Sequence, residues 1–150
     1  SFSSLLFYQR RSLRRGGFFM RAPLDAEADR TDLAWAVLAD IACSTHEQLQ
    51  HLVELTGNEG GPILGCGGGF QSEALCQMLS DLSGRELRLR AGFRQATVQG
   101  LVTLCNDYLG EVPAKRDSAL KTYHPRTGQL IHQYAPAWRE ARDRANDIKA

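Results

Sequence analysis

Residues 62–72 read Pro-Ile-Leu-Gly-Cys-Gly-Gly-Gly-Phe-Gln-Ser, and leucines recur at helical spacing over 73–83. The pattern predicts a short buried strand at 63–64, a turn without side chains at 67–69, and a helix that Gly84 ends. A strand, a glycine turn and a helix in this order can aim free backbone N–H groups at an anion or a nucleotide. The glycines alone are equally typical of a tight turn that binds nothing.

The glycine run matches neither of the two common phosphate-binding motifs. Phe70 occupies the position of the last glycine of the dinucleotide fingerprint, and no Gly-Lys-Ser/Thr follows as in a Walker A loop. His46 and His51 are one residue too far apart for the zinc-binding helix of metalloproteases, so we expect surface histidines. Cys66 is expected at a buried strand end, not as a reactive thiol. The sequence therefore predicts no catalytic residue and no metal site.

Composition narrows the class of protein. The 150 residues are enough for one domain with its own core. A formal net charge of +1 is not typical of a nucleic-acid-binding protein. No apolar run reaches the length that crosses a membrane, so we expect no membrane contact. Four cysteines form no CxxC pair and are expected to be reduced, buried thiols of a cytoplasmic protein; they are Cys43, Cys66, Cys76 and Cys105.

Two segments precede the glycine run. Residues 1–16 carry four arginines and no acid, which is compatible with a transit peptide, with a basic patch for phosphate-bearing ligands, or with a solvated segment beside a short strand at 5–8. We favour the solvated segment, and we expect the domain itself to occupy 17–150, with a strand at 18–20. A long helix is predicted over 29–56.

That long helix should be a central packing element. Asp29 or Thr31 can cap its start, and Gly57 can end it. Its apolar stripe is expected to include large side chains at 3–4 spacing, namely Leu33, Val37, Ile41, Leu49, Leu52 and Val53.

After the glycine run, charge alternates with leucine over 85–90, which predicts a strand with one buried face. A helix follows from Gln95 to Gly110, and a last helix begins near Gly128. Between them, 113–125 is expected to be a polar connection. Two strands joined through a helix imply a parallel crossover, so the class is α/β. The helix after Gln95 is expected to bury Val98, Leu101, Val102 and Cys105.

Several segments together resemble the C-terminal domain of the FGGY carbohydrate kinases, the relatives of rhamnulokinase, xylulokinase and fuculokinase. The ordered matches run over about residues 17–146 and begin with a signature-like helix at 32–39. They continue with Gly-Gly-Gly-Phe-Gln-Ser at 67–72, Asp-Leu-Ser-Gly at 81–84, and Gln-Ala-Thr-Val-Gln-Gly at 95–100. The ordered set, more than any single motif, carries the resemblance.

The resemblance implies part of an actin-like ATPase fold of the ribonuclease H-like type, in which helices cover a small parallel or mixed sheet. It implies ATP with Mg²⁺ in a cleft between two lobes. Gly67, Gly68 and Gly69 would contact the nucleotide. Ser72 matches the polar position that faces adenine, and Gln71 is a further candidate in the same turn.

The resemblance also implies a kinase that transfers the γ-phosphoryl group of ATP to a sugar hydroxyl. The sugar-binding N-terminal lobe and its proton-accepting aspartate have no counterpart in these residues, so the chain alone is expected to be inactive. The sequence leaves open whether the chain forms a homodimer. One alternative is a non-catalytic interaction or regulatory module on the same fold. The other is an unrelated α/β domain with an anion-binding turn.

Overall fold

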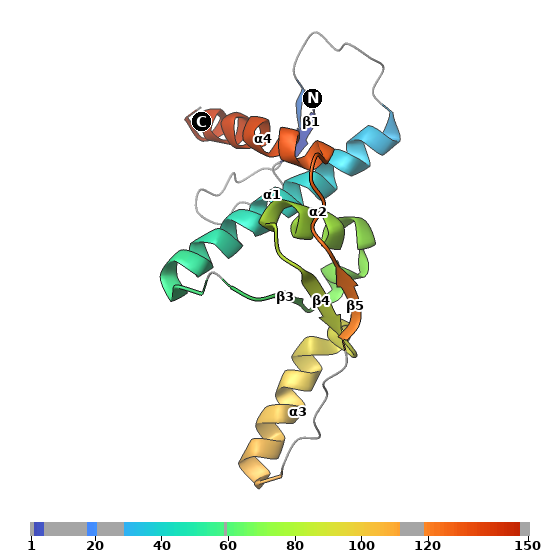
Figure 1. Ribbon diagram of the computed structural model, residues 1–150, viewed down its shortest axis with the longest axis vertical. Helices are drawn as coiled ribbons and strands as arrows, with labels where there is room; N and C mark the ends of the chain where they lie inside the picture. Colours follow the sequence, from blue (N-terminus) through green and yellow to red (C-terminus); the bar gives the residue numbers. More distant parts are fainter. Residues whose placement is uncertain (1, 5–17, 21–28, 59, 112–118, 148–150) are drawn as a thin grey trace.

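The computed structural model describes residues 2–4, 18–20, 29–58, 60–111 and 119–147, and Figure 1 shows their arrangement. A two-stranded sheet, a three-stranded sheet and four α-helices lie in these ranges. In chain order the elements are β1 (Phe2–Ser4), β2 (Phe18–Met20), α1 (Arg30–Thr56), β3 (Ile63–Gly65), η1 (Gly68–Gln71), α2 (Glu73–Ser83), β4 (Leu87–Arg90), η2 (Phe93–Gln95), α3 (Ala96–Leu109), β5 (Ala119–Tyr123) and α4 (Leu130–Asp147).

The long helix α1 begins and ends as the sequence predicts. The Asp29 carboxylate accepts hydrogen bonds from the backbone N–H groups of Thr31 and Asp32, so Asp29 and not Thr31 is the cap. Asp32 returns a bond to the backbone N–H of Asp29, which completes a capping box. Gly57 ends the helix in the left-handed conformation at φ 65°.

The predicted apolar stripe of α1 is wrong in part. Leu33 is exposed and Leu52 is 56% exposed, whereas the buried positions are Asp40 and small residues: Ala36, Ala39, Ala42 and Cys43. Small side chains allow α2 and α4 to pack close to the α1 backbone, and both helices contact α1. The large residues near its C-terminal end lie beyond those two helices.

The three-stranded sheet has the order β3-β4-β5. β3 and β4 are parallel and are joined through α2, which confirms the predicted crossover. β5 pairs antiparallel with β4, so the prediction of a polar connection over 113–125 is wrong at 119–123. Tyr123 of this edge strand is buried in the core. β2 confirms the strand predicted at 18–20, whereas the strand predicted at 5–8 lies outside the described residues.

The core has two adjoining parts, and Met78 and Leu82 of α2 pack against both. Between α1, α2 and one face of the three-stranded sheet lie Ala42, Leu75, Cys76, Leu79, Leu87, Leu89, Phe93 and Tyr123. Between α1 and α4 lie Ala39, Cys43, Ile131, Tyr134 and Trp138. The indole N–H of Trp138 donates to the buried carboxylate of Asp40 at 2.6 Å, which satisfies both groups.

Helix α3 stands apart from this core (Figure 1). Its predicted buried face is wrong: Val98 and Leu101 are each 59% exposed, and Cys105 is exposed. Among the described residues no other element covers it, and it adjoins η2, from which it continues. The prediction of four buried thiols holds for Cys43 and Cys76 and is wrong for Cys66 and Cys105.

Candidate functional site

The glycine run forms the turn that joins β3 to α2. β3 ends at Gly65, a single 3-10 turn spans Gly68–Gln71, and Ser72 caps α2. The backbone N–H of Gly67 donates to the carbonyl of Phe93 at 2.7 Å. The turn is therefore fixed at the end of β3 and against η2.

Two of these glycines are required by the fold itself. A Cβ on Gly65 would lie 2.7 Å from Leu89 Cδ2 and 2.8 Å from Phe70 Cδ1, inside the packed core. Gly67 has φ 101° and ψ 168°, a backbone conformation that side chains with a Cβ rarely adopt. Their presence says nothing about a ligand.

The fold does not require glycine at Gly68 and Gly69 as it does at Gly65 and Gly67. Their φ angles lie outside the left-handed region, and a Cβ on Gly69 would meet nothing within 4 Å. A Cβ on Gly68 would meet only the amide nitrogen of Gln71, at 3.7 Å. Because neither packing nor backbone conformation of the described chain requires glycine here, the missing side chains leave open space beside the backbone. Such space is what a ligand that approaches the peptide groups needs.

The residues after the glycines have distinct roles. Phe70 is half-buried against the core, and its carbonyl accepts from Cys76 Sγ at 3.3 Å. Gln71 is exposed beside Gly68. Ser72 Oγ accepts from the backbone N–H of Leu75 at 3.3 Å, which caps α2 and leaves its O–H as a donor. The structure thus brings the five predicted site residues into one turn.

A cation that the sequence reasoning missed lies beside this turn. Lys121 of β5 forms an ion pair with Glu73, the first residue of α2. The hydrogen bond to Glu73 is the main cause that raises the pKa of Lys121 above its ordinary value. Its ammonium group also lies 5.1 Å from the centre of the Tyr123 ring. The alternation of Leu120, Lys121, Thr122 and Tyr123 is typical of a strand, but the sequence analysis predicts a polar connection there.

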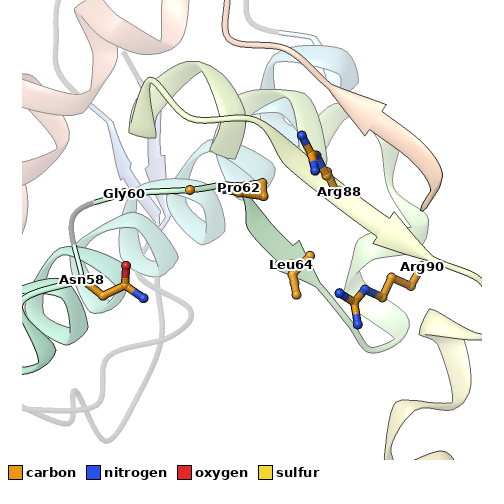
Figure 2. A pocket seen from close by; sticks show the side chains of 7 residues that line it. Asn58, Gly60, Pro62, Leu64, Arg88 and Arg90 are labelled. Atoms are coloured by element: carbon orange, nitrogen blue, oxygen red, sulfur yellow. The ribbon is translucent and has the colours of Figure 1, made fainter. Parts of the chain in front are cut away.

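Apart from the glycine turn, a hollow lies along β3, on the sheet face opposite α2 (Figure 2). Its volume is about 390 Å³, and it is lined by Asn58, Gly60, Gly61, Pro62, Leu64, Arg88 and Arg90. Within the ranges that the structure describes, no group of three or more His, Cys, Asp or Glu residues is placed to hold a metal ion. No helix in those ranges is long and apolar enough to cross a membrane.

Comparison with known sequences gives one family and one relative. The model of the C-terminal domain of the FGGY family of carbohydrate kinases matches residues 1–106. The chain is 31% identical over 137 residues to "Putative sugar kinase YoaC" of Bacillus subtilis (strain 168), in an alignment that covers 91% of this chain and 28% of that protein. The chain thus spans less than a third of the length of this relative.

Solved structures give the same fold at low identity. A xylulose kinase from Rhodospirillum rubrum has a TM-score of 0.69 at 13% identity, over 98% of this chain and 31% of that one. A xyloylose kinase from Brucella ovis has a TM-score of 0.68 at 21% identity, over 90% of this chain and 28% of that one. Glycerol kinase of Plasmodium falciparum, solved with ADP, has a TM-score of 0.66 at 18% identity, over 91% of this chain and 28% of that one. These likenesses confirm the partial actin-like ATPase fold.

Proposed function

Because the chain belongs to the FGGY family of carbohydrate kinases, we propose that its glycine turn binds the nucleotide of a sugar kinase. ATP would lie against the peptide groups of Gly67, Gly68 and Gly69, with Gln71 and Ser72 as polar contacts of the same turn. The complete protein would transfer the γ-phosphoryl group of ATP to a sugar hydroxyl.

One observation carries the proposal. Gly68 and Gly69 lie beside open space in ordinary backbone conformations, so the fold itself gives no reason for glycine at these positions. The neighbouring N-terminus of α2 adds partial positive charge, which favours phosphate oxygens. The solved glycerol kinase of the same fold holds ADP, which makes ADP the first ligand to test.

The remaining parts of the kinase reaction are not offered by the described residues. The carboxylate at the turn, Glu73, is already paired with Lys121, so the turn has no free carboxylate for Mg²⁺. An Mg²⁺ ion would have to arrive bound to the phosphates of ATP. Sugar binding and proton abstraction would belong to the part of the protein that the matched 28% does not include. This chain alone would then bind nucleotide without phosphorylating a sugar.

Three earlier expectations stay predictions. They are the boundary between a basic segment at 1–16 and a domain at 17–150, the homodimer, and the cytoplasmic location. The boundary falls among residues that the structure does not describe.

Isothermal titration calorimetry of the full chain with ADP tests the proposal. We expect saturable binding to the wild type and at least a tenfold loss of affinity in Gly68→Val, because the new side chain fills the space beside the turn. Gly60→Val is the matched control, since a Cβ on Gly60 also meets nothing within 4 Å and Gly60 lies at the other end of β3. Circular dichroism should show that both variants fold.

Two outcomes would overturn nucleotide binding at the turn. If Gly68→Val binds ADP as tightly as the wild type, the glycines serve the fold and not a ligand. If the folded wild type gives no heat with ADP at millimolar concentration, the non-catalytic interaction module becomes the better reading of this fold. Binding of inorganic phosphate without preference for ADP would instead favour a general anion-binding turn.

A further inference from the structure

Glu73 places a negative charge beside the turn at which a nucleotide would bring its own. It is the first residue of α2 and directly follows Ser72, the cap of that helix. A carboxylate at this position stabilises the helix, because it faces the positive end of the helix dipole. The same carboxylate would repel the phosphate groups of ADP or ATP. The residue that favours the helix therefore opposes the proposed ligand unless its charge is balanced.

Lys121 lies on the side of the sheet from which it can balance this charge. In the antiparallel pairing of β4 with β5, Lys121 stands opposite Leu89, whose side chain is buried toward α2. Directly opposed residues of neighbouring strands project to the same face of a sheet. Lys121 therefore projects toward α2, where its ammonium group forms an ion pair with the Glu73 carboxylate.

The ammonium group of Lys121 is also held from a second side. It lies 5.1 Å from the ring centre of Tyr123, which is buried two residues further along the same strand. The face of an aromatic ring attracts a cation, so the ring and the carboxylate together restrict the lysine side chain. The pair joins residues 48 positions apart, so it forms only when β5 is in its place beside β4.

We propose that Lys121 is a positioning residue of the nucleotide site, which neutralises Glu73 and holds its carboxylate toward β5 so that phosphate groups can approach the glycine turn. This inference rests on the proposed function. Lys121 acts through Glu73 and is not itself a phosphate ligand, because its ammonium group is already engaged by the carboxylate and the ring. Repulsion by an unbalanced carboxylate grows with the charge of the ligand. The pair therefore favours nucleotides with several phosphates over the uncharged nucleoside.

Isothermal titration calorimetry of the full chain with adenosine, AMP and ADP, at low and constant ionic strength, tests this role. Lys121→Met keeps a long apolar side chain and removes the charge that balances Glu73. We expect ADP affinity to fall about three- to tenfold, AMP affinity to fall less, and adenosine affinity to stay unchanged. Adding Glu73→Gln to Lys121→Met should restore ADP affinity, and Lys121→Arg should retain it.

Arg88→Met is the matched control. Arg88 of β4 forms an ion pair with Glu86 at 2.7 Å, but it lies on the face of the sheet opposite α2, since Leu87 and Leu89 are the buried residues of that strand. Its removal should leave the affinity for all three ligands unchanged. Exposed ion pairs contribute little to stability, so circular dichroism should show that each of these variants folds.

Several results would overturn the role of Lys121. Unchanged ADP affinity in Lys121→Met would mean that the Glu73 charge does not reach the nucleotide. A loss that Glu73→Gln does not restore would make Lys121 a direct phosphate ligand or a purely structural residue. An equal loss in Arg88→Met would reflect general charge alone. If the wild type does not bind ADP, the proposed function fails together with this inference, whereas ADP binding that Lys121→Met leaves intact removes this inference alone.

Discussion

Helices α2 and α3 begin alike and end in different environments. Each follows a short 3-10 turn, each has apolar residues at helical spacing, and each ends at a glycine in the left-handed conformation. α2 lies between α1 and the sheet and buries Leu75, Cys76 and Leu79. α3 buries no residue at all. The same local pattern therefore gives a core helix in one place and an uncovered apolar helix in the other.

The difference shows what apolar spacing predicts and what it does not. Spacing determines that a segment is helical and which residues share a face, but it does not identify the surface that covers the face. An isolated helix of 14 residues is marginal in water, so α3 needs a covering surface to be stable. That surface is not among the described residues. The chain spans 28% of the length of the Bacillus subtilis relative.

The largest expected difference between the two helices is in the rate at which their cysteines react with an alkylating reagent. Cys76 of α2 is fully buried, and Cys105 of α3 is exposed. Burial raises the pKa of Cys76, and burial together with the Asp40 and Glu47 charges raises the pKa of Cys43 to about 12. At pH 8 a thiol with that pKa is ionised in about one molecule in ten thousand. We expect iodoacetamide to modify Cys66 and Cys105 at least a hundredfold faster than Cys43 and Cys76.

Mass spectrometry of the native and the urea-unfolded chain measures this difference. The native chain should gain two labels quickly, and the unfolded chain should gain four. Peptide mapping then assigns the fast sites. Protection of Cys105 to the same degree as Cys76 would mean that α3 is covered in solution, and the contrast between the helices would not hold. Cys105→Ser should remove one fast label and leave the slow pair unchanged.

Truncation of one leucine on each helix gives the next largest effect. Leu79 is 4% exposed in the core, so Leu79→Ala should lower the free energy of unfolding by about 2–5 kcal/mol through lost burial and an unfilled cavity. Leu104 of α3 is 65% exposed, so Leu104→Ala should change it by less than about 0.5 kcal/mol. Urea denaturation followed by circular dichroism measures both. Equal losses would place α3 in a packed environment.

Local signals account for what the sequence predicted well in this fold. The ends of α1 and α2 follow from Asp29, Gly57, Ser72 and Gly84, whose side chains or backbone conformations act within one turn of the helix. The parallel crossover follows from the strand-helix-strand order. The five residues of the candidate site share one turn because they lie within six consecutive positions, and their role in nucleotide binding stays a prediction.

Contacts between residues far apart in the chain account for the features that the sequence did not predict. β5 contributes Tyr123 to the core and pairs with β4, and its formation depends on that neighbouring strand. Lys121 was missed for the same reason. The sequence predicts large apolar side chains on the buried face of α1, whereas mostly small residues form it, because close approach of α2 and α4 selects small side chains. The open hollow near Arg90 could not be predicted, since it depends on which sheet face the helices cover.

The last comparison concerns one acidic residue near the C-terminal end of each helix. Asp81 of α2 is 4% exposed and accepts hydrogen bonds from the backbone and guanidinium of Arg126 and from Gln77, all at 2.8 Å in their shortest contacts. Asp107 of α3 is exposed. Burial is the largest single influence on the pKa of Asp81 and raises it, but the bonds from Arg126 and Gln77 together outweigh it and lower the pKa.

The substitution Asp81→Asn should therefore lower the free energy of unfolding at pH 7 by about 1–3 kcal/mol, because Arg126 and Gln77 lose a buried, charged acceptor. A carboxyl group with a lowered folded-state pKa stabilises the fold above its unfolded pKa of about 3.9, and this stabilisation is lost as the pH falls through the folded-state pKa. The difference between wild type and Asp81→Asn should thus shrink below about pH 4. Urea denaturation at pH 7, 5 and 3.5 measures it.

The control Asp107→Asn should not lower the free energy of unfolding as Asp81→Asn does. A carboxylate near the C-terminal end of a helix faces the negative end of the helix dipole, so its removal from the exposed α3 should leave stability unchanged or raise it by a few tenths of a kcal/mol. A loss as large as that of Asp81→Asn would mean that Asp107 has a buried cation as its partner. A pH-independent loss in Asp81→Asn would show that packing of the carboxyl group matters at this position, and not its charge.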